Sequence, residues 1–269
     1  MESMQKQLMK QPFTPLKSCK GPGPVKWNVP PLIFVLLPCM LMLPLAAQAQ
    51  GRSTLTHGEW EASFFYGGSF LGSGRYVTPV EGSGQNSSRT VGLRYASGYL
   101  MGASITENRW QHWGATLEYA FSNQPMTFTN LSDSIPSLSF GQSIHRFAYD
   151  VLYYPRDQYQ RLRPYAFAGP GVALFYIKGS GKDAASVQGI RLNDPWKFTM
   201  NWGGGIKYLV KDHAVASFQF SDSISGVPGY GLPPTGKAGP GGYVAGFRPD
   251  GLMNNWLISV GFNYQFEIR

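Results

Sequence analysis

The chain has 269 residues, and its 23 basic residues outnumber its 15 acidic ones, for a formal net charge of +8. Only 14% of the residues are charged, and the bases beyond residue 50 form no run of Lys or Arg, so nucleic-acid binding is not expected. Both cysteines, Cys19 and Cys39, lie in the first 49 residues, which excludes disulfides, zinc–thiolate clusters and thiol nucleophiles from the rest of the chain. We expect neither a cofactor nor a bound metal.

The N-terminal region has the pattern of a secretory signal peptide. Lysines precede an apolar stretch from Val29 to Leu45, and Ala47 and Ala49 supply the small residues of a cleavage site. We therefore predict a cleaved signal peptide over 1–49 and a mature domain over 50–269. A membrane anchor is the alternative, but prolines interrupt an apolar run that is short for a span of about 20 residues.

Clusters of Gly, Pro, Asn and Ser divide the remaining chain into eight candidate strands. They lie near 59–68, 89–106, 113–123, 143–154, 164–177, 196–209, 214–224 and 253–267.

The connections between these strands alternate strictly between long and short. The long ones are 69–88, 124–142, 178–195 and 225–252, and the short ones are 107–112, 155–163 and 210–213. Long loops at one end and short turns at the other are typical of an up-and-down barrel in the bacterial outer membrane.

The final strand shows the alternation that decides between a soluble and a membrane barrel. Its apolar residues are Trp256, Ile258, Val260, Phe262, Tyr264 and Phe266, and between them stand polar or small residues, with Leu257 as the one large exception. Because successive side chains point to opposite faces, one face is apolar and aromatic. Eight such faces cannot all point inward, since an eight-stranded barrel holds only modest side chains. The sequence therefore predicts an all-β fold: an eight-stranded antiparallel up-and-down transmembrane β-barrel in the outer membrane.

The opposite faces of the strands carry charges that this fold places in the lumen. We predict a structural ion-pair network that plugs the barrel, because buried charges are tolerated when they are paired. Its members are Glu61, Arg94, Glu118, Arg146, Asp150 and Lys207. A proton or ion path is the alternative, but eight strands leave no continuous aqueous channel.

Three segments resemble a known family. Arg163 to Val172 is similar to the "RPY-x-x-x-G-x-G" fifth strand of small outer-membrane barrels, the group of the OmpA transmembrane domain and the opacity proteins. Trp202 to Tyr208 resembles the sixth strand of that group, and Gly261 to Phe266 the closing strand. The resemblance implies an eight-stranded outer-membrane barrel in contact with lipid and lipopolysaccharide, whose C-terminal strand is recognised by the barrel assembly machinery. It implies no single activity.

Some small barrels modify lipid A, and a hydrolase of this kind needs a nucleophile, a base and an orienting acid in reach of one another. Only His145 falls near the external rim, beside Ser143, and by parity with Phe147 it points outward. The segment Asp222 to Gly226 has no histidine to act as a base. We expect no catalytic residue and a structural or surface-interaction role, with 225–252 as the loop for a surface partner. The alternatives are a deacylase-like lipid A-modifying barrel and a soluble periplasmic ligand-binding barrel.

Overall fold

The computed structural model describes residues 59–81, 87–108, 110–131, 137–187, 190–239, 242–244 and 246–266. The predicted signal peptide and its cleavage site lie outside these residues and stay predictions.

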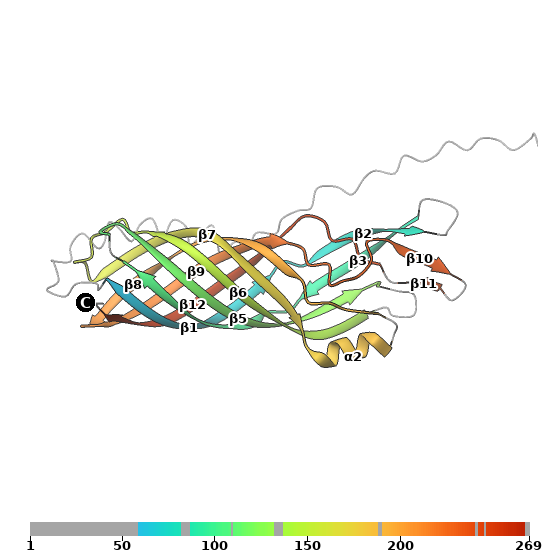
Figure 1. The fold of residues 1–269 in the computed structure, drawn as a ribbon, viewed down its shortest axis with the longest axis horizontal. Helices are drawn as coiled ribbons and strands as arrows, with labels where there is room; N and C mark the ends of the chain where they lie inside the picture. Colours follow the sequence, from blue (N-terminus) through green and yellow to red (C-terminus); the bar gives the residue numbers. More distant parts are fainter. Residues whose placement is uncertain are drawn as a thin grey trace, which may run out of the picture. The chain divides into compact units, whose positions relative to one another are not determined.

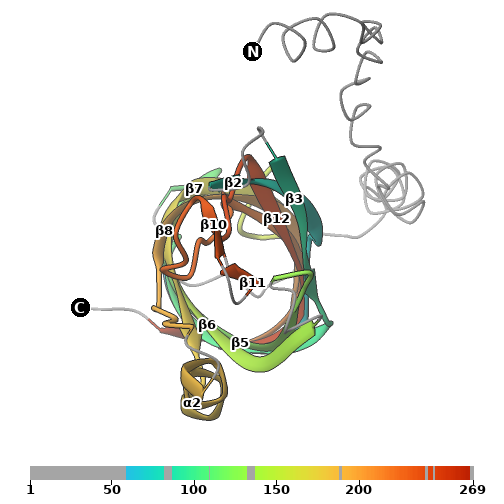
Figure 2. The ribbon, with the colours of Figure 1, turned by 90° about the vertical axis from the view of Figure 1, so that its right-hand side faces the viewer.

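Eight strands form the wall of a closed antiparallel barrel (Figures 1 and 2). They are β1 (Trp60–Leu71), β4 (Gly98–Glu107), β5 (Trp113–Thr129), β6 (Ser137–Tyr153), β7 (Leu162–Ile177), β8 (Trp196–Lys211), β9 (Ala214–Gly226) and β12 (Leu252–Phe266).

Each strand of the wall pairs with the next, and β12 returns to pair with β1, with Phe64 opposite Phe262. This closure removes every free edge from the wall, which lipid requires because it offers no hydrogen bonds to the backbone. The short connections between β4 and β5, β6 and β7, and β8 and β9 meet at one end (Figure 1). By the layout of outer-membrane barrels, this end is periplasmic and the opposite end is extracellular.

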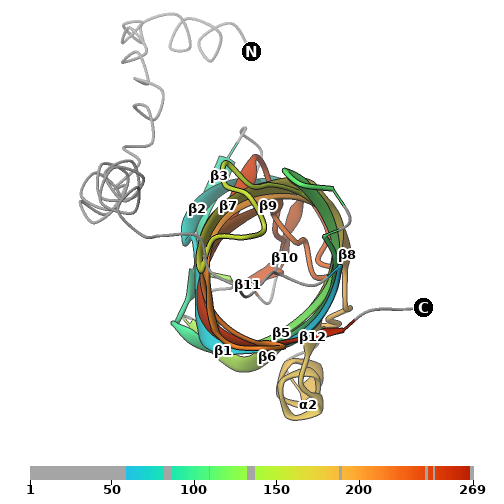
Figure 3. The same cartoon turned by 90° about the vertical axis from the view of Figure 1, so that its left-hand side faces the viewer.

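The extracellular end contains more regular structure than the sequence predicted. It has β2 (Gly74–Glu81), β3 (Ser87–Tyr95), β10 (Gly236–Gly239), β11 (Gly242–Val244) and the helix α2 (Gly179–Val187). We call β2, β3 and the segment 227–251 the head. The helix lies outside the barrel wall, next to β6 (Figures 2 and 3). Among the described residues, no helix combines the length and apolar character needed to cross a membrane.

Two expectations about the strands were therefore wrong. The segment 89–106 is not one strand, because β3 ends at Tyr95 and β4 begins at Gly98. Most of 124–142 is not loop, because β5 and β6 continue to Thr129 and from Ser137, and their cross-strand pairs extend that far. The Gly, Ser and Pro content of these segments reads as loop, but pairing with a neighbouring strand outweighs local propensity.

The predicted faces are confirmed. Phe64, Leu117, Phe198 and Val260 are each about 60% exposed on the outer surface, whereas the residues between them along the strands point into the barrel. A soluble barrel would bury these apolar side chains, so the soluble periplasmic alternative is wrong. The outer surface is the apolar band of a membrane barrel.

Candidate functional site

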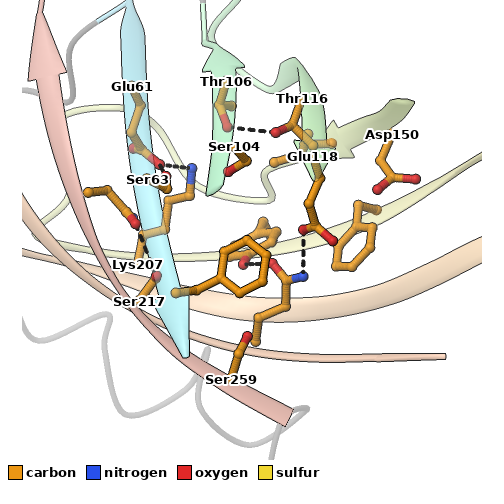
Figure 4. A pocket seen from close by; sticks show the side chains of 16 residues that line it. Glu61, Ser63, Ser104, Thr106, Thr116, Glu118, Asp150, Lys207, Ser217 and Ser259 are labelled. Atoms are coloured by element: carbon orange, nitrogen blue, oxygen red, sulfur yellow. Dashed lines mark hydrogen bonds and ion pairs between the residues drawn. The ribbon is translucent and has the colours of Figure 1, made fainter. Parts of the chain in front are cut away.

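The interior of the barrel is the candidate site, because it gathers charged side chains from four strands of the wall, β1, β5, β6 and β8. Glu61 of β1 and Lys207 of β8 form an ion pair of 2.6 Å between Oε1 and Nζ, and both side chains are at most 4% exposed. Figure 4 shows the two side chains pointing toward one another. Strand alternation places both residues inward, as the sequence predicted.

A second ion pair spans two adjacent strands. The guanidinium of Arg146 on β6 donates a hydrogen bond to the carboxylate of Glu118 on β5, and both side chains are buried. Gln219 of β9 donates its amide to the other oxygen of Glu118 at 3.4 Å, and Tyr165 of β7 donates its hydroxyl to Gln219 at 2.8 Å. A chain of polar contacts thus runs across the lumen from β5 to β7 and β9.

The structure brings four of the six predicted lumen charges into pairs, and Asp150 lies inside without joining one. Asp150 is 1% exposed, and its Oδ1 atom has no hydrogen-bond partner among the described residues. It lies apart from Glu61 and Lys207 in Figure 4.

The prediction that Arg94 belongs to the lumen network is contradicted by its position. Arg94 lies on β3 in the head and is exposed. Tyr95 at the end of β3 pairs with Met126 of β5, and Tyr99 of β4 pairs with Asn123 of β5. The three residues 96–98 therefore lie opposite only two residues of β5, 124 and 125. An extra residue of this kind reverses the faces of a strand, as a β-bulge does. Parity counted through a single strand therefore put Arg94 on the wrong side.

Sequence reasoning missed a cation at the periplasmic end. Arg163 is fully buried, with its guanidinium carbon 3.6 Å from the ring centre of Tyr154, and it donates to the carbonyl oxygen of Gln111 at 2.9 Å. The Tyr154 hydroxyl donates to Asn108 at 2.7 Å and accepts from Lys207 at 3.2 Å. Alternation from the inward residues Tyr165 and Phe167 is the sequence signal that places Arg163 inward as well.

These side chains leave little free space. The cavity among the ion pairs has a volume of about 30 Å³ and is lined by residues such as Ser63, Thr116 and Gln219. That is room for about two water molecules. Toward the head, the buried side chains of Phe65, Leu100, Ala120 and Leu257 form a separate apolar cluster.

The head closes the extracellular end with apolar side chains. Tyr230 and Phe247 of segment 227–251 are fully buried in one cluster with Phe128 of β5. The ring of Phe128 lies 5.9 Å from that of Tyr230 and 5.4 Å from that of Phe247, in edge-to-face arrangements.

Hydrogen bonds of the Tyr230 hydroxyl, which we call the latch, connect segment 227–251 to β6 and β3. The Tyr230 hydroxyl donates to Oε1 of Gln142 at 3.1 Å, and the hydroxyls of Tyr95 and Tyr230 lie 2.8 Å apart. Burial raises the pKa of both tyrosines above the ordinary value of 10.0, so both remain neutral. Tyr230 and Gly231 adopt positive φ angles of 52° and 77°, the left-handed turn that re-aims the chain here.

Two polar residues occupy outward positions of the strands. His145 faces outward as predicted, and its Nδ1 atom lies 2.9 Å from the hydroxyl of Tyr119. Asp222, which the sequence analysis did not place, shares the outward parity of Phe218 on β9 but is 1% exposed and accepts a hydrogen bond from Asn254. Across the described ranges, no three His, Cys, Asp or Glu residues gather in a group that could hold a metal ion.

Comparison with known proteins finds similarity among solved structures. No protein-family model and no curated protein matches the chain. The outer membrane protein OprG from Pseudomonas aeruginosa superimposes with a TM-score of 0.51 at 16% identity, over 79% of this chain and 99% of OprG. Neisserial surface protein A matches with a TM-score of 0.44 at 11% identity, over 81% of this chain and all of that protein.

At 16% identity, the similarity to OprG shows the fold alone. The apolar outer band and the closed wall independently indicate a membrane environment. The chain is therefore an eight-stranded outer-membrane β-barrel, as its resemblance to the small barrels of the OmpA transmembrane-domain and opacity-protein group predicted.

Proposed function

We propose that this protein is a non-conducting, non-catalytic barrel that presents its head to a partner at the cell surface. The observation that carries the proposal is that the interior is closed twice, by ion pairs in the lumen and by the apolar cluster under the head. A transport protein needs a continuous path, and neither level offers one. The barrel then serves as a rigid support, and specificity belongs to the head.

The charge of the head indicates the kind of partner. The segments 74–95 and 227–251 contain five basic residues, Arg75, Arg89, Arg94, Lys237 and Arg248, against the two acids Glu81 and Asp250. All but Arg89 of these seven are exposed. The predicted contact loop 225–252 is only partly available, because its Tyr230 and Phe247 are buried. The exposed bases favour an acidic surface such as a phosphorylated or sulfated polysaccharide.

The non-catalytic part of the proposal is supported by the surroundings of His145. A hydrolase needs a base oriented by an acid and in reach of a nucleophile. The partner of Nδ1 in His145 is the hydroxyl of Tyr119, and among the described residues no hydrogen bond joins His145 to Ser143 or to a carboxylate. The lipid A-modifying alternative therefore lacks its orienting group.

Lipid and assembly complete the proposed partners. The apolar outer band contacts membrane lipid and lipopolysaccharide. We further propose that the barrel assembly machinery recognises β12, since this strand closes the wall against β1 and carries the outward residues Val260, Phe262 and Tyr264.

Two experiments test these roles separately. Planar-bilayer recording of the pure protein should show no steady conductance, and stable porin-sized openings would revive the transport role. Mass spectrometry of lipid A from cells with and without the protein should give identical spectra. Loss or gain of an acyl chain that depends on His145 would establish the enzyme instead.

The surface partner is tested with charged polymers. Vesicles that contain the protein should retain dextran sulfate but not neutral dextran. The double variant Lys237→Glu, Arg248→Glu should lose this retention, whereas Lys211→Glu at the periplasmic end should keep it in one-sided vesicles. Equal retention by both variants would contradict the assignment to the head.

A further inference from the structure

The outer wall of the barrel carries a hollow that its function as a support does not require. Tyr119, His145, Phe147, Leu174 and Trp196 line it, one or two residues from each of four adjacent strands, β5 to β8. Its volume is about 420 Å³, and the exposed aromatic side chains around it face the membrane. The hollow opens toward lipid, so an acyl chain is its natural occupant.

The hollow contains a polar pair that a purely hydrocarbon ligand would leave with an unsatisfied hydrogen-bonding group. The Tyr119 hydroxyl and Nδ1 of His145 satisfy one another at 2.9 Å, but Nε2 of His145 has no hydrogen-bond partner among the described residues. Within a lipid-facing wall, an unpaired ring nitrogen is costly, because there is no water to bond it. A hydroxyl group carried along the lipid chain would satisfy it in either tautomer, because a hydroxyl can both donate and accept.

A cation stands above the hollow on the same outer face. His145 pairs with Leu174, and two and four residues further along β7 and its end come Tyr176 and Lys178. The side chain of Lys178 crosses β6 over Gly141, where an added Cβ would lie 2.8 Å from its Cδ atom. Gly141 therefore leaves the space in which the lysine lies. The four residue steps from Leu174 to Lys178 span about 13 Å.

The two lysines near this edge differ in their availability. Lys182 of α2 is already paired with Asp194 at 2.5 Å, and its Nζ atom lies 5.1 Å from the ring centre of Tyr176. Lys178 is exposed and has no ion-pair partner within the part of the chain that the structure describes. Lys178 is thus the free positive charge at the extracellular edge of the hollow.

We propose that this wall binds one lipid A moiety of lipopolysaccharide, with a phosphate at Lys178 and a hydroxylated acyl chain in the hollow against His145. The proposal commits to lipid A because the site pairs an anion-binding lysine with a polar group about 13 Å further down the wall. A glycerophospholipid carries a phosphate but no hydroxyl along its chains. The inference is independent of whether the head binds a partner or the lumen conducts.

Native mass spectrometry of the detergent-purified protein with added lipid A tests the site. The wild type should hold one bisphosphorylated lipid A, and Lys178→Ala and His145→Leu should each weaken its binding about tenfold, as expected for the loss of one strong hydrogen bond. The controls are Lys211→Ala, an exposed lysine at the periplasmic end, and Phe262→Ala, an exposed aromatic of β12. Both should bind like the wild type, and heat-modifiable migration should verify that every variant is folded.

Competition distinguishes this site from ordinary lipid contact. Lipid A without phosphates should bind the wild type as weakly as intact lipid A binds Lys178→Ala. Trp196→Ala, which removes one wall of the hollow, gives a second test should His145→Leu fail to fold. Unchanged binding by Lys178→Ala, or phosphatidylglycerol displacing lipid A at equal concentration, would overturn the proposal.

Discussion

The lumen and the head close the same barrel by opposite chemistry. In the lumen, Glu61, Lys207, Glu118 and Arg146 are held by two ion pairs and their hydrogen bonds. In the head, tightly packed aromatic and aliphatic side chains exclude water, and the Tyr230 hydroxyl adds hydrogen bonds with Gln142 and Tyr95. The stability of a polar closure depends on every buried charge having a partner, whereas the stability of an apolar closure depends on side chains that fill the available volume. The two regions should therefore fail in different ways when single residues are changed.

The largest expected effect is in the lumen. Arg146→Ala would leave the buried carboxylate of Glu118 without its cation, and breaking a buried pair in this way costs about 3–5 kcal/mol. Urea titration of the protein in lipid vesicles measures this loss of unfolding free energy. The exposed Arg94 is the matched control, and Arg94→Ala should change the same free energy by less than about 0.5 kcal/mol. Equal effects of the two substitutions would remove the distinction between lumen and head.

A cavity in the head should act locally. Phe128 contacts the rings of both Tyr230 and Phe247, so Phe128→Ala should destabilise the head by about 3–4 kcal/mol. Hydrogen exchange should then increase in 227–251 and in β2 and β3, while the amides of β7 to β9 stay protected. If the whole wall exchanged faster, the head and the barrel would be one cooperative unit.

The outer face gives the next largest effect. Val260 is 60% exposed to lipid, and Val260→Arg should cost about 2–4 kcal/mol if the site lies near the bilayer midplane. Its inward neighbour Asn263 accepts a hydrogen bond from Ser217, and Asn263→Ala should cost only about 1 kcal/mol. Refolding yields in vesicles compare the two variants. Equal yields would contradict the assignment of faces.

The smallest effect concerns the latch and its dependence on pH. Tyr230→Phe should lower the unfolding free energy of the head by about 1 kcal/mol. The substitution removes the hydroxyl that contacts the Tyr95 hydroxyl and the amide oxygen of Gln142. Burial raises the pKa of Tyr230, so the unfolded head loses the proton first as the pH rises. The contribution of Tyr230 to the unfolding free energy of the head is therefore complete below its ordinary pKa of 10.0 and decreases as the pH rises above that value. Protease digestion of the head between pH 8 and 11 should show this fall, reduced in Tyr230→Phe; an identical fall in both would place the titration elsewhere.

The sequence was sufficient for the barrel because period-two alternation is a local signal. Residues such as Val260 and Phe262 reveal their face without any knowledge of their neighbours, and so do Glu61 and Lys207. Pairing partners are not local, and parity alone could not tell that Glu61 meets Lys207 from the far side of the lumen.

The head could not be predicted for a different physical reason. Its chain is rich in Gly and Pro, which read as loop, yet Tyr230 and Phe247 are buried by contacts with strands far away in the sequence. Arg94 was misplaced because the extra residue between β3 and β4 is visible only in the register with β5.

Conductance of a barrel that lacks segment 232–247 of the head tests the central claim most directly. The backbone amide of Phe247 donates to the carbonyl of Pro233 at 2.8 Å, so a short Gly-Ser linker can replace 232–247 without moving the flanking residues. This replacement removes Leu232 and Phe247 from the apolar cluster but leaves both ion pairs intact. In planar bilayers we expect the folded variant to show as little conductance as the wild type, because the ion pairs close the lumen independently. A steady conductance that appears only after segment 232–247 is replaced would contradict this independence.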